Sequence, residues 1–220
     1  MYELFIGTFI TFFVVIDPLG VAPIFAVMTD GASNAFKRRM VFKATLTGAS
    51  ILLLFAFVGT GLLSALGISM MAFKTAGGVL LFMLALEMVF EKRTERREKK
   101  TEGLTHEPDE SPTAVIETDD DFEDISVFPM GIPFIAGPGS IASIMLMMSH
   151  HEGNYTDQGI ILSALTACLL LTVIILLAAS KIINLMGQTV ANVITRILGV
   201  ILAAMATQYM FDGIKAAFFG

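Results

Sequence analysis

The chain has 220 residues, of which 55% are hydrophobic and only 15% are charged, and its mean hydropathy is +0.77. Soluble domains are much less apolar, so this composition excludes an ordinary soluble protein and predicts an integral membrane protein. The formal net charge of -6 says little about partners, because the acidic residues gather between positions 107 and 124. Nothing in the charge pattern indicates binding to nucleic acid.

Two further features of the composition limit the function. The single cysteine, Cys168, lies in an apolar run, so neither an intramolecular disulfide nor a cysteine metal cluster is expected. The first residues lack the basic region of a cleavable signal peptide, so we expect the first apolar segment to remain as a membrane span.

A membrane-spanning helix needs about 20 mostly apolar residues. Six segments meet this requirement, and they predict an all-α polytopic membrane protein with six transmembrane helices. In chain order the predicted spans are Leu4 to Met28, Ala44 to Leu66, Met71 to Phe90, Ile125 to Ser149, Gly159 to Ser180 and Ala191 to Phe211.

The long polar stretch between the third and fourth segments divides the chain into residues 1–91, a linker 92–124, and residues 125–220. The linker begins with basic residues and then turns acidic, which is typical of a solvated, disordered segment. Short loops rich in lysine and arginine stay in the cytoplasm. Basic residues occur at positions 37–43, in the linker and on both sides of the predicted loop between the fifth and sixth spans, at Lys181 and Arg196, whereas the opposite side has only Lys74 and Lys215. We therefore expect both termini to be periplasmic and the linker to be cytoplasmic.

The third and sixth spans resemble each other. Aligning them pairs Gly78 with Gly199, Leu81 with Leu202 and Ala85 with Ala206. Nearly the same register places the prolines of the first and fourth spans at corresponding positions. A repeat with an odd number of spans enters the membrane in the opposite sense the second time, so the pattern predicts two inverted three-helix repeats, as in many transporters.

The first and fourth spans are each interrupted in the middle of an apolar run by proline and glycine. We expect both helices to be broken at mid-membrane, where irregular backbone is tolerated only if it is buried in protein or lines a cavity. The candidate residues for binding a substrate or a coupling ion are Asp17, Pro18, Leu19, Gly20, Gly137, Pro138, Gly139 and Ser140.

The local chemistry of these breaks favours half-helices. Aspartate is a preferred N-cap, and proline is favoured at the first helical position, so Asp17 and Pro18 predict the start of a second half-helix. Its free N–H groups would attract a carboxylate, and unwound carbonyls would suit a cation. Two alternatives stay open. The prolines could only kink their helices, and Asp17 could be a cap, a functional carboxylate or both.

Other polar residues carry weaker signals. The hydroxyls of Thr8, Thr11 and Ser143 could line a site, although hydroxyls in spans more often bond back to their own helix. His150 and His151 are interpreted as a solvated turn rather than a metal site. Lys74 is interpreted as an interfacial anchor.

The segments around the two breaks, Asp17 to Phe25 and Phe128 to Ser140, resemble the MarC family of six-span bacterial inner-membrane proteins. The similarity extends over nearly the whole chain, although the linker is longer and more acidic than that of the family. Some members of this family are described as transporters of small neutral amino acids such as alanine and glycine. The resemblance therefore implies an inner-membrane location and a solute of this kind.

Together these features predict a secondary transporter that works by alternating access, with H+ or Na+ as the coupling ion. No enzymatic activity, cofactor or metal is expected, because the spans offer one deep acid and no histidine and the chain has no phosphate-binding glycine loop. The expected partners are the solute, the coupling ion and the lipid bilayer, and the oligomeric state is left open. The alternative is a membrane scaffold or sensor that docks a partner through the linker.

Overall fold

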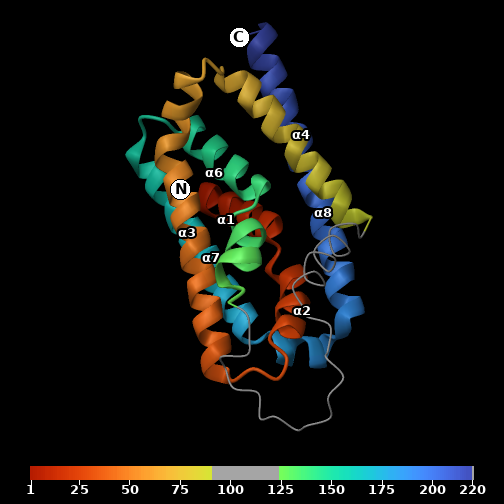
Figure 1. The fold of residues 1–220 in the computed structure, drawn as a ribbon. Coiled ribbons are helices and arrows are strands. Elements are labelled where there is room, and N and C mark those ends of the chain that lie inside the picture. The colour runs from red at the N-terminus through yellow and green to blue at the C-terminus, as the bar shows by residue number, and fades with distance from the viewer. Residues whose placement is uncertain (91–123, 220) are drawn as a thin grey trace.

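The computed structural model describes residues 1–90 and 124–219, and all regular structure in these ranges is helical (Figure 1). The predicted linker lies outside the described residues except for Asp124. In chain order the elements are α1 (Tyr2–Ile16), α2 (Pro18–Met28), α3 (Asn34–Ala65), α4 (Met70–Val89), the irregular helical segment η2 (Ser126–Ile135), α6 (Pro138–His150), α7 (Tyr155–Leu177) and α8 (Ala179–Phe219).

Length and composition confirm the all-α polytopic architecture. Five helical stretches are long and apolar enough to cross a membrane: Tyr2–Met28, Asn34–Ala65, Met70–Val89, Tyr155–Leu177 and Asn192–Phe218. The pair Ser126–Ile135 and Pro138–His150, bent by 54°, makes a sixth if it counts as one span. Many large apolar side chains on these helices are exposed, as expected for surfaces that face lipid; examples are Phe57, Leu170 and Val200.

Two helices extend beyond the spans that hydropathy predicted. α3 begins at Asn34 because Ser33 caps it, with the Ser33 hydroxyl accepting from the Phe36 N–H at 3.1 Å. The basic residues 37–43 therefore lie in the first turns of α3 and not in a loop. α8 begins at Ala179, so Lys181 and Arg196 both lie within this helix. The predicted loop before Ala191 was wrong, because hydropathy marks the apolar part of a helix whereas capping residues and helix breakers mark its ends.

α4 and α8 lie side by side along much of their length (Figure 1). Their contact is reciprocal: a Cβ atom on Gly78 would lie 2.8 Å from the Ala206 carbonyl oxygen, and one on Gly199 would lie 3.2 Å from that of Ala85. Small residues at these points let the two backbones approach closely. The residues that pair in the sequence alignment of the two spans thus occupy equivalent places in the contact, while the inverted repeat of the whole chain stays a prediction.

An apolar cluster joins the end of α1 to the contact between α4 and α8. We call it the inner cluster, and its buried members are Val14, Val15, Leu81, Ala85, Met88, Leu202 and Ala206. A larger core of buried apolar residues connects the remaining helices. The inner cluster matters here because it lies next to the first broken helix.

Candidate functional site

The first break is a single residue, Asp17, between α1 and α2. Its backbone is left-handed, with φ 53°, and its N–H still donates to the Phe13 carbonyl at 3.0 Å. Pro18 has no N–H to continue the ladder of α1, and it occupies the first turn of α2. Aspartate tolerates left-handed backbone better than most residues. The chain therefore stops one helix and starts the next without an intervening loop.

The Asp17 carboxylate is completely buried and hydrogen-bonded. Its Oδ1 accepts from the Gly20 N–H at 3.1 Å and from the Thr195 hydroxyl at 3.2 Å. A Cβ atom on residue 20 would overlap the carboxylate, so glycine at this position lets the Asp17 side chain fold over the start of α2. The predicted cap at Asp17 is confirmed, as is the position of Pro18 at the start of the helix.

Sequence reasoning missed Thr195. This residue lies on α8 and is 4% exposed, and its hydroxyl ties the last helix to the first break. It lies far from Asp17 in the chain, and one threonine in a long helix has no local signature. The interaction makes the first break a junction between α1, α2 and α8.

The second break lies between η2 and α6. Gly137 caps α6 with extended backbone, at φ -84° and ψ 169°, and contributes no side-chain hydrogen bond. A Cβ atom on Gly137 would lie 2.6 Å from the Pro133 carbonyl oxygen, so the bend leaves no room for a side chain there. Within η2, Phe128 and Ile132 have extended backbone, each before a proline, as the steric effect of proline predicts.

The two breaks lie close together in the fold. A Cβ atom on Gly139 would lie 3.0 Å from Val15 Cγ1, and Val15 is two residues before Asp17. Ser140 is buried beside this contact at 1% exposure, whereas Pro138 is exposed and Leu19 is half-buried. The predicted residues therefore form two neighbouring backbone junctions, of which Asp17 and Ser140 are the fully buried polar members.

The hydroxyls near the breaks behave differently from one another. The Thr11 hydroxyl bonds back to the Gly7 carbonyl at 2.8 Å, as expected for a threonine in a span. The hydroxyls of Thr8 and Ser143 are buried and have no hydrogen-bond partner among the described residues. Buried polar groups without partners are rare in folded proteins, and each one calls for an explanation.

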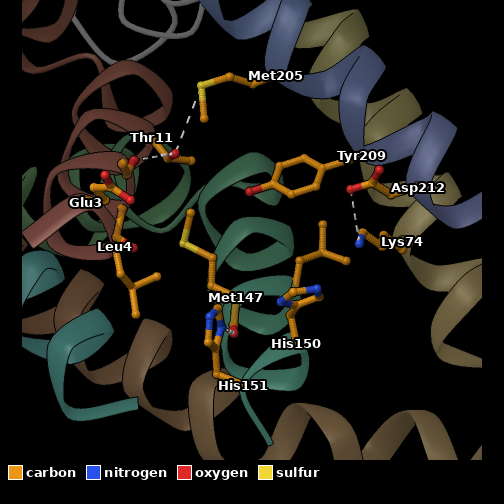
Figure 2. Close-up of a pocket in the computed structure, with 13 residues that line it drawn as sticks. Glu3, Leu4, Thr11, Lys74, Met147, His150, His151, Met205, Tyr209 and Asp212 are labelled. Atoms are coloured by element: carbon orange, nitrogen blue, oxygen red, sulfur yellow. Dashed lines mark hydrogen bonds and ion pairs between the residues drawn. The ribbon is translucent and has the colours of Figure 1, made fainter. Parts of the chain in front are cut away.

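A cavity of about 300 Å³ lies between α1, α4, α6 and α8. Figure 2 shows its polar side chains, and none of the eight residues predicted as a site lines it. The residues that matter for its chemistry are Glu3, Thr8, Lys74, His150, Tyr209 and Asp212. Thr11 also lines the cavity, and Val15, one turn further along α1, belongs to the inner cluster. Asp17 follows about 9 Å beyond Thr11, at 1.5 Å per helical residue.

The charged groups of the cavity make contacts that the sequence did not predict. The Lys74 Nζ lies 3.4 Å from the Asp212 Oδ2, and the Lys74 side chain is only 18% exposed, so Lys74 is ion-paired, while its role as an interfacial anchor stays a prediction. The Gln208 Nε2 donates to the other Asp212 oxygen at 2.8 Å. His150, exposed at the end of α6, and His151, in the turn that follows, agree with the sequence interpretation as a solvated turn, and both also line the cavity (Figure 2). Among the described residues no group of histidine, cysteine or acidic side chains could hold a metal ion.

Comparison with known proteins places these features in a family. Residues 2–218 match the family described as MarC family integral membrane protein. The UPF0056 membrane protein YhcE of Escherichia coli is 32% identical over 100% of this chain and 95% of its own length. YvbG of Bacillus subtilis is 30% identical over 99% of this chain and 97% of its own, and a UPF0056 membrane protein of Methanocaldococcus jannaschii is 30% identical over 98% of both chains. No solved structure matches the chain at a significant level.

Proposed function

This chain belongs to the MarC family of integral membrane proteins, and we propose that it is a secondary transporter of small neutral amino acids or similar solutes. We place it in the bacterial inner membrane, with both termini periplasmic and residues 92–124 cytoplasmic. This orientation is supported by the basic start of α3, where Lys43 pairs with Asp124 at 2.9 Å. The ion pair brings the basic end of α3 to the same side as the end of the linker.

The observation that carries the proposal is the environment of Asp17. An acid in the middle of a span is expensive to bury, and such residues commonly mark substrate or ion pathways. Here the carboxylate is fully buried at a break in the helix and is bound by α2 through Gly20 and by α8 through Thr195. A proton or a sodium ion arriving at this carboxylate would compete with the Thr195 hydroxyl and loosen the connection to α8.

Alternating access requires a site that opens to one side at a time. We propose that the cavity between α1, α4, α6 and α8 is the entrance on the side of the termini, and that the inner cluster, which includes Val14 and Val15 of α1, closes a route from it to Asp17. We propose that movement of α8 relative to α1 opens this route when the Asp17 carboxylate is neutralised. The second break contributes the uncapped start of α6, whose N–H groups favour a carboxylate.

Transport by the purified full chain in proteoliposomes tests this function. Uptake of labelled L-alanine or glycine into the vesicles is measured with a pH gradient or a sodium gradient imposed separately. We expect uptake that one of the two gradients drives. Asp17→Asn keeps the shape of the side chain but removes its charge, and should lower gradient-driven uptake at least about tenfold, the effect of about 1.4 kcal/mol.

Two comparisons make the experiment decisive. Asp30→Asn removes an exposed acid between α2 and α3 and should leave uptake unchanged. Thr195→Val removes the hydroxyl that donates to Asp17. This variant should change the dependence of uptake on the driving ion, and it should change uptake without an ion gradient to a smaller extent. Uptake that is absent in the wild type, or that Asp17→Asn leaves intact, would contradict the proposal.

A further inference from the structure

The cavity at the ends of α1 and α4 has charges of both signs on separate walls. Lys74 and Asp212 lie together on one side, and Glu3 lies on the opposite side (Figure 2). Asp212 is already held by Lys74 and by Gln208. Lys74 has three N–H donors and makes a long ion pair of 3.4 Å, so its ammonium retains donors for a second anion. This wall therefore suits a carboxylate, and the Glu3 wall suits a cation.

The cavity also contains a hydroxyl that no described residue satisfies. Thr8 lies on the face of α1 that lines the cavity, its side chain is 2% exposed, and its hydroxyl has no partner among the described residues. A hydroxyl can donate one hydrogen bond and accept others, so it can bind either charged group of a ligand. Because leaving such a group unpaired is unfavourable, a ligand that pairs with it gains affinity.

The rest of the lining limits the size and polarity of the ligand. Leu4, Leu146, Met147 and Met205 contribute apolar surface. The volume of about 300 Å³ is at the lower end of small-molecule sites. The cavity thus fits a compact molecule with two opposite charges and a small apolar part.

We infer that this cavity is a binding site for a small zwitterion with one carboxylate and one ammonium group. Lys74 binds the carboxylate, Glu3 binds the ammonium group, and the Thr8 hydroxyl supplies a further hydrogen bond. The site is separate from the two helix breaks and precedes them on the route through the protein. This inference rests on the proposed function in one respect: a solute that enters from the side of the termini reaches this cavity before the helix breaks.

Equilibrium binding of labelled L-alanine to the detergent-purified full chain tests the charge requirement. Propionate and ethylamine, which each carry one of the two charges, serve as competitors. We expect saturable alanine binding, with each competitor weaker by at least about tenfold, since a hydrogen-bonded charge contributes on that order to affinity. Competition by propionate as strong as that by unlabelled alanine would contradict a site that requires both charges.

Two variants locate the binding. Lys74→Met removes the cation, and Thr8→Val replaces the unpaired hydroxyl by a methyl group of similar size, and each should raise the Kd for alanine on the order of tenfold. Thermal stability should not fall in Thr8→Val, because the Thr8 hydroxyl has no partner to lose in the part of the chain that the structure describes. The matched controls are Lys215→Met and Thr166→Val, at exposed positions on α8 and α7 outside the cavity, and they should bind alanine as the wild type does.

The outcomes separate this inference from the proposed function. If alanine is transported but Lys74→Met and Thr8→Val bind it normally, the cavity site is wrong while the transporter stands. If the wild type transports alanine without saturable binding, the cavity site is also wrong. If the wild type neither binds nor transports a small amino acid, both fail. Binding that both variants weaken, in a protein whose stability is intact, supports the site.

Discussion

The two helix breaks have similar sequences but different structures. At the first break the capping residue is Asp17, whose carboxylate bonds to the next turn and to α8, and α1 and α2 together count as one continuous span. At the second break the capping residue is Gly137, which provides no side chain, and the chain bends by 54°. One junction is held by a side chain, whereas the other depends on close approach of the backbone.

This difference suggests a division of labour between the breaks. In the proposed mechanism the carboxylate at the first break is the group that a proton or a cation would neutralise, because this carboxylate holds the bonds to α2 and α8. The glycines at the second break have no ionisable side chain. They allow the close backbone approach at the bend, and they leave the start of α6 without a side-chain cap. Substitutions that add a single methyl group at each break should therefore have unequal effects.

The largest effect is expected for Gly137→Ala. The new Cβ atom would lie 2.6 Å from the Pro133 carbonyl oxygen, and backbone cannot move aside as a flexible side chain can. The backbone of Gly137 is extended and suits alanine, so the whole cost comes from this overlap, about 3 kcal/mol. Reversible unfolding in mixed micelles measures it, with Gly159→Ala, where nothing lies near the added atom, as the control. Equal stability of the two variants would show that the second break does not depend on close packing.

A smaller effect is expected for Gly20→Ala. The added methyl group displaces the Asp17 carboxylate and breaks its bond from the Gly20 N–H, a charged hydrogen bond of about 2 kcal/mol. Alanine in a helix recovers about 1 kcal/mol through its higher propensity. The same unfolding measurement should therefore give a net loss of about 1 kcal/mol. A loss as large as that of Gly137→Ala would remove the distinction between the two breaks.

The smallest effect is expected at Asp124, which lies two residues before η2, the segment that leads to the second break. The hydrogen bond from Lys43, with further bonds from Ser126, lowers the pKa of the Asp124 carboxyl to about 2. A lowered pKa stabilises the fold above the ordinary value near 4, and this contribution is lost as the pH falls toward 2.

Water screens this ion pair, because half of the Asp124 side chain is exposed. Asp124→Asn should therefore cost only about 0.5 kcal/mol at neutral pH. The difference in unfolding free energy between Asp124→Asn and the wild type should vanish when unfolding is measured near pH 2. A constant difference at all pH values would show that the ion pair is not its source.

Part of the structure of the first break could be predicted from the sequence, because it depends on neighbouring residues. The cap at Asp17 and the helix start at Pro18 depend on neighbouring residues and on the missing N–H of proline, so they are visible in a few letters of sequence. The same holds for the interruption at Gly137, although not for its bend. The bend depends on how η2 packs, and glycine permits many angles. Helix ends at Asn34 and Ala179 were misplaced because hydropathy does not report them.

From the sequence alone, the length of the apolar runs predicted the all-helical membrane architecture, the motifs around the prolines predicted the family, and proline and capping residues located the two breaks, because all these signals lie in short stretches of chain. The packing of the helices was needed to show that Thr195 reaches Asp17, that Lys74 pairs with Asp212 and that the Thr8 hydroxyl faces a cavity with no partner among the described residues. These contacts join residues far apart in the chain. Their geometry depends on how whole helices pack, and no local pattern encodes it.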